Sequence, residues 1–114
     1  MYNDSELKRW FVLQTKPRKE KIVLQQIEQK KIEVYSPFIE KIRIWSDRKK
    51  KIQVPLFSGY VFIHGDESER IKAITDTIGA MKYIYFQKRP AVVNDREIEI
   101  IKQALLSPEK ISIE

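Results

Sequence analysis

Short apolar runs of strand length alternate with amphipathic stretches along this chain, and that alternation limits the possible fold more than any other feature. The runs centred on Trp10–Leu13, Tyr60–His64 and Met81–Phe86 are rich in bulky and β-branched residues. The stretches between them repeat apolar residues every three or four positions, as amphipathic helices do. Because two of the strands are joined only by a short turn, we expect an α+β fold: a mainly antiparallel four-stranded sheet with a β-hairpin extension, flanked by about three helices.

The first two helices have recognisable ends in the sequence. The first is predicted to begin at Lys16–Arg18, with Pro17 in its first turn, where a missing N–H costs nothing. Lys30-Lys31 near its end complements the helix dipole. Ser68 is the predicted N-cap of the second helix, and Gly79 is predicted to stop it.

The third helix is predicted from its start signal. Asn94 followed by Glu97 resembles a capping box, with Asn in place of Ser or Thr. Residues 87–93 before it, which contain Pro90, are expected to be a loop. Its apolar stripe is predicted to be Ile98, Ile101 and Leu105.

A long hairpin with a basic tip is predicted between residues 39 and 57. Ile39–Trp45 and Lys51–Phe57 each alternate apolar with polar residues, which is the pattern of a half-buried strand. Ser46–Lys50 between them is expected to be a charged turn. Pro55 is expected to mark an edge, a bulge or the end of a strand, because proline cannot donate to a ladder.

Length and composition indicate one globular domain. A chain of 114 residues can bury one modest core. It contains no cysteine, which excludes disulfides and thiolate metal sites. No apolar run approaches the roughly 20 residues that cross a bilayer, so we expect a cytoplasmic protein without a membrane partner. The expected organisation is a lead-in over residues 1–8, a domain over 9–106 and a tail over 107–114.

Positive charge is concentrated in one half of the chain. The net charge is +6, and residues 1–57 contain 14 lysines and arginines against 7 aspartates and glutamates. Residues 58–114 contain 8 against 9. A basic half on a small domain indicates either a polyanionic partner or a solubilising surface, and charge alone does not decide between them.

Four segments resemble the NusG N-terminal domain family. Trp10–Lys21 is similar to the family's opening strand and first helix, and Asn94–Ile98 to the start of its third helix. Trp45–Lys50 and Val54–Phe62 resemble its second block. The resemblance covers about residues 9–106, and the compact Trp-Ser-Asp-Arg hairpin resembles specialised paralogues of the RfaH and UpxY kind. Ser58-Gly59 departs from the Pro-Gly of many relatives, and we do not expect these residues to include the KOW domain that is usual in the family.

The resemblance implies an accessory factor of transcription. Such a domain is expected to bind the clamp helices of the largest RNA polymerase subunit as a monomer and to suppress pausing or termination. It is also expected to lie near upstream DNA or the non-template strand. The alternative is a free-standing nucleic-acid-binding module that uses the basic N-terminal half.

An aromatic set supplies the candidates for polymerase binding. Tyr60 and Phe62 lie two residues apart and therefore share one face of a strand. In the family, the matching positions help to form an apolar depression for the clamp helices. The other interpretation is that these are ordinary core residues, and we favour that interpretation for Trp10 and Ile84. The full candidate set is Phe57, Tyr60, Phe62, Trp10 and Ile84.

Two basic clusters supply the candidates for nucleic-acid binding. One lies at the junction of the first strand and helix, where free N–H groups assist phosphate contacts. The other lies at the hairpin tip beside Trp45, which could stack on a base. Each is equally compatible with a solvated surface. The candidates are Lys16, Arg18, Lys19, Lys21, Arg48, Lys49 and Lys50, with Lys51 continuing the tip.

No enzymatic or metal chemistry is predicted. His64 is the only histidine, and alone it has no partners for a metal site or a catalytic triad. The chain has three glycines and no phosphate-loop pattern. We therefore expect no catalytic residue, no metal and no cofactor.

Overall fold

The structure is a computed structural model that describes residues 6–106. Its main sheet is antiparallel, with strand order β2-β5-β1-β6 and with β9 also paired to β1. The strands are β1 (Arg9–Thr15), β2 (Glu33–Tyr35), β5 (Tyr60–Gly65), β6 (Ala80–Tyr83) and β9 (Val92–Val93). The predicted α+β class is confirmed, although the sheet has five strands because β9 forms within the expected loop. The tail predicted over 107–114 and most of the predicted lead-in lie outside the described residues.

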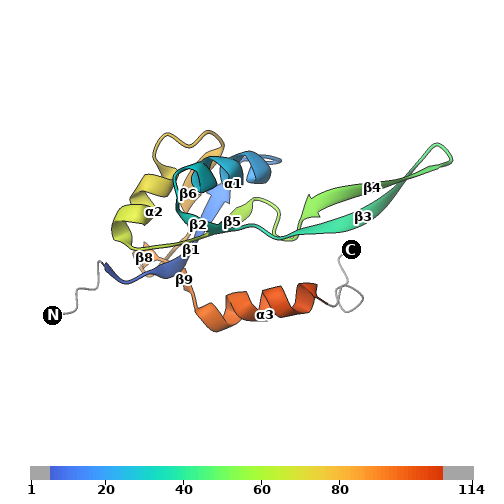
Figure 1. Ribbon diagram of the computed structural model, residues 1–114. Helices are drawn as coiled ribbons and strands as arrows, with labels where there is room; N and C mark the ends of the chain where they lie inside the picture. The colour runs from blue at the N-terminus through green and yellow to red at the C-terminus, as the bar shows by residue number, and fades with distance from the viewer. Residues whose placement is uncertain (1–5, 107–114) are drawn as a thin grey trace.

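Helices cover both faces of this sheet. Figure 1 shows α1 (Glu20–Gln29) and α2 (Glu67–Ile74) above it and α3 (Asp95–Leu105) below it. The larger core lies between the sheet and the first two helices. Alternate residues of β1 and β5 point into it, as the two-residue period of a strand requires. Its fully buried members include Leu13, Val61 and Ile63 from the sheet and Val23 and Ile27 from α1.

The predicted hairpin is confirmed, with a shorter turn than expected. It consists of β3 (Phe38–Trp45) and β4 (Arg48–Pro55), and it projects away from the body of the domain (Figure 1). Only Ser46 and Asp47 form the turn, with φ angles of 40° and 66°. Two left-handed residues match the twist of the flanking strands, so Arg48 and the lysines after it belong to a strand.

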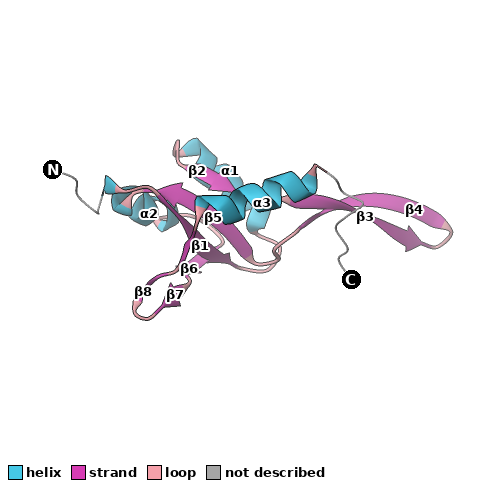
Figure 2. Cartoon of the chain, turned by 90° about the horizontal axis from the view of Figure 1, so that it is seen from below, coloured by secondary structure: helices cyan, strands magenta, loops and turns pink. Residues whose placement is uncertain are grey.

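A second, smaller hairpin replaces much of the predicted loop. It is formed by β7 (Tyr85–Phe86) and β8 (Arg89–Pro90), and Figure 2 shows it projecting from the sheet on the side away from α1. Gln87 and Lys88 form its turn with positive φ angles. The single strand expected over residues 81–86 is therefore interrupted at Ile84.

Two helices begin or end at different residues from those expected. α1 begins at Glu20 rather than Lys16, because Arg18 is left-handed, with φ of 64°. The N-cap of α2 is Asp66 and not Ser68. The Asp66 carboxylate accepts the Glu69 N–H at 2.8 Å, and the Glu69 carboxylate accepts the Asp66 N–H at 3.0 Å. α2 also ends at Ile74, before the predicted stop at Gly79.

The start of α3 is confirmed. The Asn94 side-chain oxygen accepts the Glu97 N–H at 2.9 Å, and the Asn94 amide donates to the Glu97 carboxylate at 3.0 Å. This cap satisfies a backbone donor that the helix leaves without an internal partner. Figure 2, seen from below, shows α3 lying across the lower face of the sheet. The predicted stripe residue Ile98 is buried there.

Candidate functional site

The strand register places the aromatic candidates on the face that α3 only partly covers. In the β1–β5 pair, Trp10 lies opposite His64 and Val12 lies opposite Phe62. Paired residues and residues two apart share a face of the sheet. Tyr60 therefore continues the same face, opposite to the larger core.

α3 covers one end of this face. Ile98 forms a buried cluster with Trp10 and Phe62, and Tyr35 packs against it. The Lys102 ammonium lies 5.8 Å from the Trp10 ring and 5.3 Å from the Tyr35 ring, within cation–π range. Trp10 is only 4% exposed. The structure thus places this candidate in the core beneath α3.

The uncovered part of the face is an apolar depression of about 300 Å³. Tyr60 is 37% exposed, whereas Phe62 is 7% exposed and is the more buried of the two. The structure thereby brings together four of the five candidates. It adds Val12, which the sequence analysis missed although it lies two residues from Trp10 and therefore on the same face of the strand. The residues that line the depression are Val12, Phe57, Tyr60, Phe62 and Ile84.

Backbone hydrogen bonds hold Ile84 at the depression. Its N–H donates to the Val12 carbonyl at 2.9 Å, and its carbonyl accepts the Ala91 N–H at 2.8 Å. Ile84 is thus fixed between β1 and the residue that joins β8 to β9. The break between β6 and β7 lies at this residue, so one side chain of the predicted long strand becomes part of the depression.

The loop that carries Phe57 and Tyr60 is held on both sides of Gly59. The Gly59 N–H donates to the Glu20 carboxylate at 2.6 Å, and its carbonyl accepts the Thr15 N–H at 2.8 Å. Its φ of 85° is a conformation that glycine adopts without strain. The Phe57 ring meets the Phe62 ring edge-on, at 5.4 Å between centroids. The depression therefore has a fixed rim.

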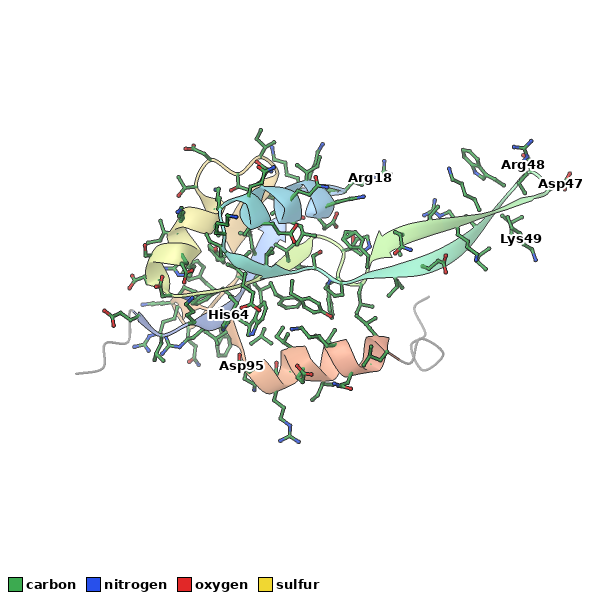
Figure 3. The ribbon with its side chains drawn as sticks, viewed as in Figure 1. Arg18, Asp47, Arg48, Lys49, His64 and Asp95 are labelled. Carbon is green, nitrogen blue, oxygen red and sulfur yellow. The ribbon has the colours of Figure 1, made fainter. Side chains whose placement is uncertain are left out.

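The basic junction before α1 adjoins the base of the long hairpin. Between them lies a groove of about 570 Å³. Arg18 and Lys21 line it from the α1 side, and Lys41 and Arg43 line it from β3. Figure 3 shows Arg18 at the junction, and Asp47, Arg48 and Lys49 at the far end of the hairpin. The two predicted clusters are therefore connected by cations that the sequence analysis did not single out.

The candidates Lys16 and Lys19 are exposed at the same junction but are not among the groove-lining residues. Lys16 donates its backbone N–H to the Gly79 carbonyl at 2.8 Å, which ties the junction to the loop before β6. The charges of Lys16 and Lys19 therefore add to the positive surface at this junction.

The hairpin register divides the tip cluster between two faces. Trp45 pairs with Arg48, and Arg43 pairs with Lys50, so these four share one face of the ribbon. Lys49 lies on the other face, opposite Ile44. Trp45 is 76% exposed. One face of the hairpin therefore combines three cations with an accessible indole, and the alternation Lys41, Arg43, Trp45 was the signal for it.

Comparison with known proteins decides the family. The family model described as NusG, transcription termination factor nusG, matches residues 8–102. This chain belongs to the NusG family. NusG-family proteins are transcription factors that act with RNA polymerase, and they are not an enzyme family. No match was found among curated proteins.

The single histidine of this NusG-family chain makes its side-chain contacts within the domain. The His64 ring packs against the Trp10 ring at 4.7 Å between centroids, and its Nδ1 lies 2.7 Å from the Glu33 carboxylate. Within residues 6–106, no three His, Asp or Glu side chains are grouped to hold a metal ion. No helix in that part of the chain is long and apolar enough to cross a membrane.

Proposed function

We propose that this domain binds RNA polymerase through the apolar depression, and that its partner there is the pair of clamp helices of the largest subunit. The observation that carries the proposal is the half-exposed Tyr60 beside the nearly buried Phe62. Concave patches with aromatic anchors are the usual centres of protein interfaces. The fixed Gly59 loop limits the ordering cost of binding.

Binding at this site would act on elongation through the clamp. A factor that contacts the clamp on one side and the rest of the complex on the other holds the elongating enzyme closed and so suppresses pausing or termination. The two-residue turn of the long hairpin supports placement among the specialised antitermination paralogues of the RfaH and UpxY kind.

Substitution of Tyr60 tests the proposal. Tyr60→Ala is expected to weaken binding to an isolated clamp-helix coiled coil by about tenfold or more, the loss typical of a hot-spot aromatic. Tyr85→Ala is the matched control, because Tyr85 is also exposed but lies outside the depression. Both affinities are measured by calorimetry after circular dichroism has shown a native fold. Equal affinities for the two variants would contradict the proposal.

The groove between α1 and the hairpin supports a second function in the same complex. We propose that it contacts the sugar–phosphate backbone of upstream or non-template DNA. The groove is lined by four cations and one carboxylate, Glu20, so its net charge is positive and suits a polyanion. The cations are Arg18, Lys21, Lys41 and Arg43. Each phosphate contact releases a counterion, so the salt dependence of binding reports the number of contacts.

Arg43→Gln tests this second function. We expect weaker binding to a DNA fork. The slope of the logarithm of the affinity against the logarithm of the salt concentration should be smaller by about one unit, because one phosphate contact is lost. Arg96→Gln, on the exposed start of α3, is the control for net charge. Affinities are measured by fluorescence anisotropy at several salt concentrations. An identical slope for wild type and Arg43→Gln would argue against the groove.

A further inference from the structure

Three arginines converge on a pocket that neither proposed interface uses. Arg9 comes from β1, Arg70 from α2 and Arg89 from β8, and together they line a cavity of about 500 Å³. Arg9 lies two residues from Phe11, so the two share one face of β1, and Phe11 also lines the pocket. The pocket therefore opens on the α2 side of the sheet, whereas the depression lies on the α3 side.

Arg70 is held in position before any ligand arrives. Its guanidinium carbon lies 5.6 Å from the centroids of both the Phe11 and the Tyr83 rings. Cation–π contacts on two rings restrict a side chain that otherwise has many rotamers. The Tyr83 hydroxyl donates to the Arg70 carbonyl at 2.5 Å, and this bond fixes the backbone beneath the side chain. An oriented guanidinium loses less entropy when it binds an anion.

The charges in this pocket are not balanced by the protein. Within residues 6–106, the three guanidinium groups form no ion pair and no side-chain hydrogen bond. Glu67 is the one carboxylate among the residues that line the pocket, so the lining carries two more positive than negative charges. Guanidinium groups match the fork geometry of phosphate. A phosphate dianion would neutralise this excess, whereas a single carboxylate would leave half of it.

The remaining walls are apolar and leave more room than a phosphate needs. Leu7, Pro90 and Val92 line the cavity beside Phe11. A cavity of this size is in the range of small-molecule sites, which combine apolar walls with a few charged groups. We propose that this pocket binds a nucleotide, with its phosphate held by Arg9, Arg70 and Arg89 and its sugar or base against the apolar wall. The nucleotide is either free or the 5′-phosphorylated end of a strand.

The proposal is tested by amide chemical-shift titration of the domain. The probes are adenosine 5′-monophosphate, adenosine, and a trinucleotide with and without a 5′-phosphate. We expect the phosphorylated probes to shift the amides of Phe11, Arg70 and Val92, and adenosine to leave them unchanged. Binding of the monophosphate identifies a free nucleotide as the ligand, and binding of the phosphorylated trinucleotide alone identifies a strand end.

Two neighbouring substitutions supply the matched comparison. Arg89→Gln removes one pocket cation, and Lys88→Gln removes the same charge from the adjacent residue of the same hairpin, which does not line the pocket. We expect Arg89→Gln to weaken phosphate binding by about tenfold, the usual loss for a charge-assisted hydrogen bond, and Lys88→Gln to leave it nearly unchanged.

Several outcomes would overturn the assignment. They are equal shifts with adenosine and the monophosphate, equal losses in the two variants, or no shift with any phosphorylated probe at millimolar concentration. Displacement of the monophosphate by hexaglutamate at equal concentration would identify an acidic peptide instead. None of these results depends on whether the domain binds polymerase, because the depression lies on the other face of the sheet.

Discussion

The Glu20 carboxylate lies between α1 and the loop that carries two residues of the depression. It is 3% exposed, and its hydrogen bond to the Gly59 N–H is 2.6 Å long. A hydrogen bond to a charged acceptor is stronger than one between neutral groups, and a buried N–H left without a partner is costly. One side chain outside the depression therefore positions both Phe57 and Tyr60.

Removal of this carboxylate is expected to lower the free energy of unfolding. Glu20→Ala should lower the free energy of unfolding by about 2 kcal/mol, and Glu20→Gln by less, because glutamine keeps an acceptor. Glu28→Ala, at an exposed position of the same helix, is the control and should change stability by less than about 0.5 kcal/mol. Urea denaturation measures the three values. Equal losses for Glu20→Ala and Glu28→Ala would show that the loop is held in another way.

Tyr83 makes the free energy of unfolding of the domain depend on pH in the alkaline range. Burial raises the pKa of the Tyr83 hydroxyl well above its ordinary value, although the nearby Arg70 charge opposes this effect. An unfolded chain releases this proton at about pH 10, whereas the folded chain retains it. The unfolded state therefore binds fewer protons above that pH, and the free energy of unfolding falls as the pH rises.

Tyr83→Phe is expected to remove this contribution. At pH 8 the variant should be less stable by about 1 kcal/mol, because the hydrogen bond to the Arg70 carbonyl is lost. At pH 11 the difference should narrow, since phenylalanine has no proton to release. Denaturant unfolding at both pH values measures the difference. A difference that stayed constant or grew would mean that the hydroxyl ionises in the folded state.

Among the secondary-structure elements, those with several periods of alternation were predictable and the shortest were not. The strands of the long hairpin follow a two-residue pattern over eight residues each, which the sequence displays directly. β8 and β9 have two residues each, too few for any period. β8 forms by pairing with β7, and β9 forms by pairing with β1. The pairing of β9 with β1 joins distant segments, so local sequence could not reveal it.

In the candidate site too, positions set by strand alternation were predictable and positions set by contacts between distant segments were not. Tyr60 and Phe62 were predictable because residues two apart share a strand face. The exclusion of Trp10 from the depression depends on where α3 lies, which is a contact between distant segments. Alternation puts Arg43 on the face of Trp45, but only the register of the hairpin places it beside Lys50.

The hairpin is expected to contribute to binding and little to stability. Trp45 is 76% exposed, so Trp45→Ala should change the free energy of unfolding by less than about 0.5 kcal/mol. If the indole stacks on a base, the same change should weaken binding to single-stranded DNA by about 1–3 kcal/mol. Ile44→Ala, on the opposite face of the ribbon, is the control for this strand. A comparable loss of affinity in Ile44→Ala would exclude a specific stacking role.

In the whole molecule, the depression and the basic groove lie on separate surfaces. No residue lines both of them. The loop from Leu56 to Tyr60 connects them, with Leu56 and Ser58 at the groove and Phe57 and Tyr60 at the depression. Two partners could therefore occupy the domain together, and the energies of contacts that share no atoms are expected to add.

Additivity is testable by combining Tyr60→Ala with Arg43→Gln. Tyr60→Ala should leave DNA affinity unchanged, and Arg43→Gln should leave coiled-coil affinity unchanged. For binding to a complete elongation complex, the double variant should lose the sum of the two single losses to within about 0.5 kcal/mol. A larger departure in competition binding would show that the connecting loop couples the two surfaces.

The molecule measures 62 × 30 × 27 Å, and the projecting hairpin accounts for much of its long dimension (Figure 1). Each strand advances about 3.3 Å per residue and reverses its facing side at every step. Addition of two residues to both strands would move the tip outward by about 7 Å and keep Trp45 and its cations on the same side. Addition of one residue would turn them to the opposite side. The reach of the hairpin therefore changes in fixed increments of two residues per strand, without any change in the body of the domain.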